Sequence, residues 1–131
     1  MTILVIDDEE MIRELAQSIL RHAGFEVLTA ESGQSGIRLY AEGTSLIDLV
    51  MLDLTMDDMS GVETLRRLRE ISPDLPCIIS SGQAPDLSDI PQELSRHVYF
   101  LQKPYRASQL AEMCSQAVTG FRNQPEQQRH S

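Results

Sequence analysis

The sequence predicts an α/β fold: a doubly wound, five-stranded parallel sheet with helices on both faces, forming a three-layer sandwich. Two observations lead to this prediction. Short apolar runs alternate along the chain with stretches whose apolar residues recur at helical spacing. Five such runs are present, and buried apolar strands that alternate with helices are typical of a parallel sheet covered on both sides.

The first strand is expected at residues 3–6, an apolar run that ends at four acidic residues. Apolar residues at helical spacing between positions 12 and 23 then predict a helix, and Gly24 follows as its stop. A second strand is expected at 25–28. The next helix, at about 33–42, has Ser32 as a candidate N-cap.

The third strand, at 49–52, leads into Asp53, and apolar residues at helical spacing from 62 to 71 mark the third helix, with Pro73 beyond its end. The fourth and fifth strands are expected at 77–80 and 98–101, and the final helix at 107–118. Residues 84–95 contain Pro85 and Pro91, so a helix there should be short or irregular. We expect one domain over 1–120 and a polar, disordered tail over 121–131.

Composition restricts the classes of partner. The chain has 131 residues and a net charge of −9, which disfavours direct contact with nucleic acid. The one basic stretch, Arg66, Arg67 and Arg69, is expected on a solvated helix face. No apolar run approaches the roughly 20 residues of a membrane helix, and no secretory signal opens the chain, so a cytoplasmic setting is the default. Cys77 and Cys114 should be buried in the core.

Chemistry-bearing residues follow the strands at their carboxyl ends, where open parallel sheets bind ligands. Asp7 and Asp8 follow the first strand, and Asp53 follows the third. Ser81 ends the fourth strand, and Lys103 comes just after the fifth. If the sheet forms as predicted, these side chains converge on one edge.

Three carboxylates in a small site repel one another unless a cation lies between them, and all-oxygen ligands favour Mg²⁺ or Mn²⁺ over zinc. One carboxylate can then attack phosphorus while the ion and a lysine neutralise the phosphoryl oxygens. Each motif alone is commonplace, as a solvated strand end, a turn or a strand exit. Their combination, in this order and each at a strand terminus, favours phosphoryl transfer to an aspartate.

The segments ILVIDDEE, DLVMLDLTMDDMSG, CIISSG and YFLQKPY resemble the response regulator receiver family, the CheY-like domains of two-component signalling. The resemblance covers residues 2–119 and implies a flavodoxin-like fold. It implies that Asp53 is phosphorylated, and that Asp8, Asp53 and the backbone carbonyl of Thr55 hold Mg²⁺. Asp7 would act on the ion through water.

By the same resemblance, Ser81 matches the family's hydroxyl position, with Ser80 as the neighbouring alternative, and Lys103 matches its lysine. Phe100 matches the aromatic switch position, although a plain core phenylalanine is the alternative. In the switch reading, Ser81 moves toward the phosphoryl group and the ring of Phe100 turns inward. Tyr99 should point to the opposite face.

The loop after Asp53 departs from the family pattern, because Asp57 stands where a proline is usual. Asp57 and Asp58 are then two extra acids near the site, which could weaken phosphorylation or alter ion affinity. A pseudo-receiver, which binds partners without phosphotransfer, therefore stays open beside the phospho-accepting receiver. An aspartyl-phosphate phosphatase resembling haloacid dehalogenases is disfavoured, because Thr55 stands where a second aspartate is needed.

The resemblance also implies the partners. The donor would be a phosphohistidine on a sensor histidine kinase or a phosphotransfer domain, and the output a change in the binding of an unknown protein. Such a receiver catalyses only its own phosphorylation and dephosphorylation. We expect a monomer or weak homodimer, acting as a stand-alone regulator or as a receiver excised from a larger protein, such as the C-terminal receiver of a hybrid histidine kinase.

Overall fold

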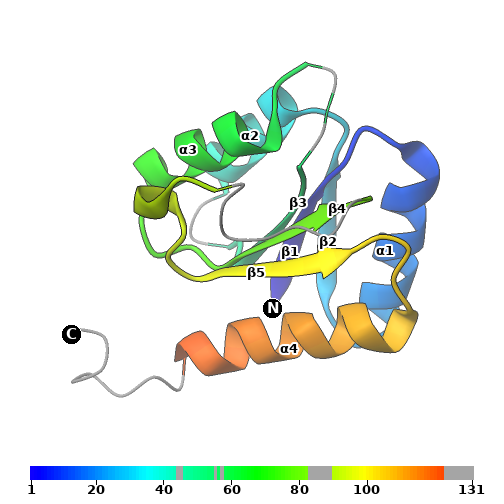
Figure 1. Cartoon of the computed structure of the whole chain (residues 1–131). Coiled ribbons are helices and arrows are strands. Elements are labelled where there is room, and N and C mark those ends of the chain that lie inside the picture. Colours follow the sequence, from blue (N-terminus) through cyan, green and yellow to red (C-terminus); the bar gives the residue numbers. More distant parts are fainter. Residues whose placement is uncertain (44–45, 55, 57, 83–89, 123–131) are drawn as a thin grey trace.

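The computed structural model describes residues 1–43, 46–54, 56, 58–82 and 90–122, and it has the predicted α/β architecture (Figure 1). All strands lie parallel in one sheet with the order β2-β1-β3-β4-β5. The strands are β1 (Thr2–Ile6), β2 (Glu26–Ala30), β3 (Leu49–Asp53), β4 (Cys77–Ser81) and β5 (Val98–Gln102). The helices are α1 (Glu10–His22), α2 (Gly33–Glu42), α3 (Gly61–Ile71) and α4 (Ala107–Arg122), with a short 3₁₀ helix, η2 (Gln92–Leu94).

The sheet separates two apolar cores, and helices lie on both of its faces (Figure 1). Helices α2 and α3 cover the core that contains Leu52 and Cys77, and α1 and α4 cover the core that contains Met51 and Cys114. Both cysteines are free and buried, as predicted. Burial raises the pKa of the Cys77 thiol to about 11 and that of Cys114 to about 12, so both stay protonated near neutral pH.

The predicted helix signals are confirmed. The Ser32 hydroxyl accepts the Ser35 backbone N–H at 3.1 Å, and the Ser35 hydroxyl accepts the Ser32 N–H at 3.2 Å, which forms a capping box at the start of α2. Gly24 has φ of 98°, a conformation that glycine adopts without steric cost, and it turns the chain from α1 into β2.

Several elements begin or end one or more residues away from their expected bounds, and β2 and α4 are two examples. Strand β2 starts one residue later than predicted and continues to Ala30. Helix α4 includes Phe121 and Arg122, and the rest of the expected tail, 123–131, lies outside the described residues. The weak helical segment is represented by η2, which is short as expected, while 83–89 also lie outside. Among the described helices, none has the length and hydrophobicity needed to cross a bilayer.

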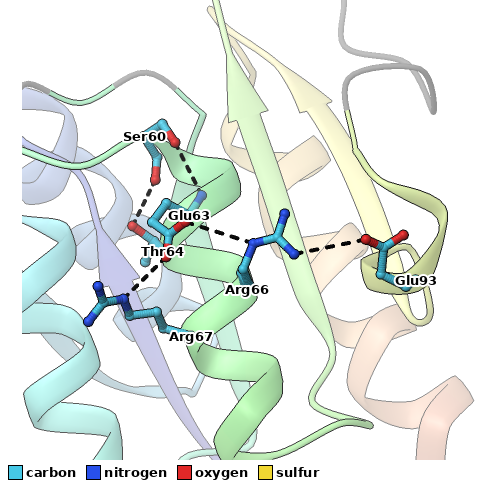
Figure 2. Close-up of polar contacts among 6 residues, drawn as sticks. All are labelled: Ser60, Glu63, Thr64, Arg66, Arg67 and Glu93. Carbon is cyan, nitrogen blue, oxygen red and sulfur yellow. Dashed lines mark hydrogen bonds and ion pairs between the residues drawn. The ribbon is translucent and has the colours of Figure 1, made fainter.

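The expectation that the arginines of α3 all lie on a solvated face is wrong for one of them. Arg66 and Arg67 keep half-exposed side chains and pair with Glu63 at 3.8 and 3.3 Å, and Arg66 also lies 3.9 Å from Glu93 (Figure 2). Arg69 instead is buried, with 8% of its surface exposed. Arg69 follows Leu65 by four residues and so shares the apolar side of the helix, but its charged residue type favoured a solvated position.

The partners of Arg69 explain its burial. Its guanidinium donates to the carbonyls of Leu75, Leu94 and Arg96, which lie in the irregular segments before β4 and around η2. A guanidinium has five N–H donors in a rigid fork, so one side chain can satisfy carbonyls from separate segments. Arg69 thus ties the end of α3 to the segment that enters β5.

We expect Arg69→Met to lower the free energy of unfolding by about 2–4 kcal/mol, because buried carbonyls lose charged hydrogen-bond donors. Arg67→Met is the matched control, since its exposed pair with Glu63 contributes only about 0.5 kcal/mol. Urea denaturation of the variants measures both values. Equal effects at the two positions would contradict the structural role of Arg69.

Candidate functional site

The carboxyl ends of β1 and β3 lie side by side, and the chain leaves these two strands toward opposite faces of the sheet. Such a switch point opens a crevice where α/β proteins bind ligands. Asp7 and Asp8 directly follow β1, and Asp53 is the last residue of β3. One carboxylate oxygen from each lies within 4.8 Å of the other two. The structure therefore brings together the three aspartates that the sequence singles out.

Lys103 reaches the same cluster from the end of β5. Its Nζ lies 2.9 Å from Asp7 Oδ2, 3.6 Å from Asp53 Oδ1 and 3.8 Å from Glu9 Oε1. Burial alone lowers the pKa of Lys103, but the hydrogen bond to Asp7 and the charges of Asp7, Asp53 and Glu9 outweigh it, and the pKa is raised. The ammonium is therefore charged throughout the physiological pH range.

The donor set fits a hard divalent cation. Asp7 and Asp53 are almost fully buried, with 2% and 5% of their surfaces exposed. Three carboxylates against the single ammonium of Lys103 leave an excess of negative charge, and two of the three are almost fully buried. All three residues offer oxygen ligands, which Mg²⁺ and Mn²⁺ prefer, whereas zinc prefers nitrogen and sulfur.

Hydrogen bonds from other parts of the protein hold Asp7 at both its side chain and its backbone. Its Oδ1 accepts the backbone N–H of Glu9 at 2.9 Å, and its Oδ2 accepts the Lys103 ammonium. Its backbone carbonyl accepts Nη1 of Arg13 at 2.8 Å. Both carboxylate oxygens thus already have protein donors, which fixes the orientation of this side chain at the base of the site.

Two serines end β4 and face opposite sides of the sheet. Alternation from Ile78 and Ile79 places Ser80 on the α1/α4 side and Ser81 on the α2/α3 side. Both are buried, and the backbone N–H of Lys103 donates to the Ser81 carbonyl at 2.7 Å. Ser80 pairs in register with Asp53, yet its hydroxyl lacks a hydrogen-bond partner in the described structure.

We expect Ser80→Ala to leave the free energy of unfolding unchanged or raise it by about 1 kcal/mol, because a buried hydroxyl without a partner costs free energy. Thermal unfolding of Ser80→Ala checks this expectation. A loss of more than about 1 kcal/mol would show that Ser80 makes an important contact.

Phe100 lies on the same face of the sheet as Ser81, and it packs partly buried against the α2/α3 core. Tyr99 packs against the α1/α4 core, so the two aromatic residues point in opposite directions as predicted. Phe100 pairs in register with Ile79, two residues before Ser81 on the same side of β4. Ser81 and the ring of Phe100 therefore lie on the same side of the sheet.

The loop after Asp53 is described in part. Thr55 and Asp57 lie outside the described residues. Asp58, expected as an extra acid near the site, instead bonds to the N-terminus of α2, where its carboxylate accepts the backbone N–H of Gly33 at 3.1 Å. The acidic cluster of the described residues is therefore Asp7, Asp8 and Asp53, without Asp58.

The structure adds two residues to the site that the sequence reasoning missed. Glu9 faces Lys103 from the rim, and Arg13 holds the carbonyl of Asp7. The run of four acids at 7–10 was a signal for Glu9, since it continues past the aspartates. Nothing in the local pattern distinguishes Arg13 from other charged residues on the exposed side of a helix.

A hollow of about 400 Å³ adjoins the cluster, and its lining residues come from α1 and the ends of β4 and β5: Ile12, Leu15, Gly82, Lys103, Pro104 and Tyr105. Leu15 of this lining is 49% exposed, and Met11, which directly precedes Ile12, is 82% exposed. Burial raises the pKa of the Tyr105 phenol to about 12. A larger hollow, of about 460 Å³, lies at the other end of the strands, beside Tyr40 and Pro76, away from the aspartates.

The sequence profile of the response regulator receiver domain matches residues 3–115 of this chain. The chain belongs to the response regulator receiver family. A receiver domain from Clostridium thermocellum, known from a crystal structure, is 34% identical, with a TM-score of 0.83 over 92% of this chain and 96% of that one. The receiver domain of the hybrid histidine kinase CckA is 30% identical, with a TM-score of 0.77 over 90% and 99% of the two chains.

Curated relatives of this receiver are longer proteins. The sensor kinase CckA of Brucella abortus is 33% identical over 84% of this chain, which covers 12% of CckA. Probable transcriptional regulatory protein TcrX of Mycobacterium tuberculosis is 38% identical over 63% of this chain, which covers 34% of TcrX. The chain thus spans about a third of TcrX and far less of CckA, and both kinases and transcriptional regulators contain domains similar to it.

Proposed function

We propose that this receiver takes a phosphoryl group onto Asp53 from a phosphohistidine donor, in a reaction that depends on Mg²⁺ or Mn²⁺. The observation that carries the proposal is the meeting of Asp53 with Asp7, Asp8 and Lys103 at the switch point of the sheet. Asp53 supplies a nucleophile at the end of a rigid strand, and Lys103 supplies positive charge within 4 Å of it.

The residues of the cluster would bind an ion in two ways, directly and through water. Asp8 and Asp53 would bind it directly, with the backbone carbonyl of Thr55 as a further ligand. Asp7 would act through water, because its oxygens already accept the Glu9 N–H and the Lys103 ammonium. A bound divalent ion would neutralise charge on the oxygens of the transferring phosphoryl group.

In the proposed transfer, a carboxylate oxygen of Asp53 forms a bond to phosphorus while the bond from phosphorus to the donor imidazole breaks. The electron pair of the broken bond returns to the imidazole nitrogen. Lys103 neutralises the phosphoryl oxygens, and the Ser81 hydroxyl donates one hydrogen bond to them. Attack by water on phosphorus later breaks the bond to Asp53, releases inorganic phosphate and restores the carboxylate. The domain would thus catalyse only its own phosphorylation and dephosphorylation.

The proposed output uses the common face of Ser81 and Phe100. Movement of Ser81 toward the phosphoryl group would vacate space on the α2/α3 side, into which the Phe100 ring could turn. Phenylalanine has no hydroxyl, so its inward state would rest on packing rather than on a hydrogen bond. The resulting change in surface around β5 would alter the binding of a protein partner.

The proposed partners follow from chemistry and charge. A sensor histidine kinase or phosphotransfer domain would supply the phosphohistidine. The exposed Met11 and Leu15 beside the cluster offer this donor protein an apolar docking surface. A net charge of −9 disfavours direct contact with nucleic acid. We propose a cytoplasmic receiver, monomeric or weakly dimeric, that acts alone or within a larger protein such as a hybrid kinase.

Incubation with acetyl phosphate and Mg²⁺, followed by intact mass measurement, tests the proposal. We expect the mass gain of one phosphoryl group, its loss in the presence of a chelator, and its location on the peptide that contains Asp53. The second reading, a pseudo-receiver, is motivated by Asp57 in the loop. It predicts no mass gain under any condition, together with partner binding that is indifferent to the phosphodonor.

A further inference from the structure

The first helical N–H groups of α2 have two different sources of acceptors. The Ser32 hydroxyl accepts the N–H of Ser35, as a local cap does. The preceding two N–H groups, of Gly33 and Gln34, donate to the carboxylate of Asp58 at 3.1 and 3.2 Å. Asp58 lies about 25 residues further along the chain, in the loop that follows Asp53. A carboxylate at a helix N-terminus is favourable, since it meets the positive end of the helix dipole.

The packing around these bonds leaves little room for movement. A Cβ on Gly33 would lie 2.5 Å from Thr64 Oγ1 and 3.1 Å from Met59 Cβ, so α2 touches both the loop and α3. A Cβ on Gly61 would lie 2.6 Å from the Asp53 carbonyl, and the Gly61 N–H donates to the Leu54 carbonyl at 2.8 Å. The start of α3 therefore packs directly against the backbone of Asp53 and Leu54.

We infer that Asp58 is a positioning residue, which fixes the loop following Asp53 by anchoring it to the N-terminus of α2. The inference rests on the proposed function in that it takes Asp53 as the phosphoryl acceptor. Asp58 accepts a pair of charged hydrogen bonds, and these restrain the loop at position 58. An anchored loop keeps a larger fraction of molecules ready to bind an ion.

Amide hydrogen exchange tests the anchor without reference to phosphorylation. In Asp58→Ala, exchange should accelerate at Gly33 and Gln34, which lose their acceptor, and also about fivefold or more at Gly61, the bond behind Asp53. Asp48→Ala is the matched control, because Asp48 accepts a backbone N–H of Thr2 at 2.9 Å at the far end of the strands. Faster exchange confined to Gly33 and Gln34 would overturn the inference, since Asp58 would then be only a helix cap.

The dependence of acetyl phosphate labelling on Mg²⁺ concentration tests the consequence for the site. In Asp58→Ala, the half-saturating Mg²⁺ concentration should rise about threefold to tenfold, while the rate at saturation changes less than about twofold. Asp58→Asn, which keeps one acceptor oxygen and the size of the side chain, should fall between wild type and Asp58→Ala. An unchanged half-saturating concentration in both variants contradicts the inference. A wild-type chain that is not labelled at all contradicts the proposed function instead, and exchange at Gly61 then decides the anchor alone.

Discussion

The Asp53→Asn variant is expected to take up no phosphoryl group from acetyl phosphate in the presence of Mg²⁺, a loss of at least about a hundredfold in labelling rate. An amide cannot attack phosphorus as a carboxylate does, while its shape fits the same space. The same substitution should raise the free energy of unfolding in the absence of Mg²⁺ by about 1 kcal/mol, because it removes one of three mutually repelling carboxylates. Intact mass and urea denaturation measure the two effects.

The two readouts separate chemistry from folding. Asp48→Asn serves as the control, since it alters a carboxylate at the opposite edge of the sheet and should keep the labelling rate of the wild type. Labelling that persists in Asp53→Asn would place the acceptor elsewhere and refute its assignment. A marked loss of stability in this variant would show that Asp53 is chiefly a structural partner of Lys103.

Replacing Lys103 by methionine should have the second-largest effect. The variant leaves Asp7 and Asp53, both almost fully buried, without their shared ammonium, and a fall in unfolding free energy of about 2–4 kcal/mol is expected. Added Mg²⁺ should recover part of this loss, because a cation in the cluster would replace the missing positive charge. Urea denaturation of wild type and Lys103→Met, with and without Mg²⁺, measures the recovery.

The stability difference between wild type and Lys103→Met should also depend on pH. The pKa of Lys103 is raised above its ordinary value of 10.5, so its ion pairs contribute in full below that pH and are lost as the pH rises through the folded-state pKa. The stability gap between wild type and Lys103→Met should hold up to about pH 10 and narrow above it. A gap that is unchanged in strong alkali would mean that Lys103 stabilises the fold by packing alone.

Much of the fold follows from local patterns. Helix α2 begins and ends where its apolar spacing and the Ser32 cap predict, and Gly24 ends α1 because its backbone adopts a positive φ. The edge that gathers the aspartates is also predictable, since parallel strands place their carboxyl ends together. Patterns of this kind depend on residues close in sequence, which is why they can be read without a structure.

Residues whose roles depend on distant partners could not be assigned in this way. Arg69 has the same charge as Arg66 and Arg67, and only the folded chain brings three carbonyls to its guanidinium. Asp58 differs from Asp53 in no local property, yet tertiary packing directs its carboxylate to the start of α2. Polarity along the chain does not record where a charged group finds its partner.

The sequence by itself determined the order of strands and helices, the aspartates and the lysine of the site, and the family to which they point. The tertiary structure decided which partners these groups have: Lys103 lies closest to Asp7, Glu9 faces Lys103 at the rim, and Asp58 bonds to the N-terminus of α2. The physical reason is the separation along the chain between the residues that interact. Strand and helix periodicity arises within a few residues, whereas hydrogen bonds and ion pairs are set by distances that exist only after the chain has packed.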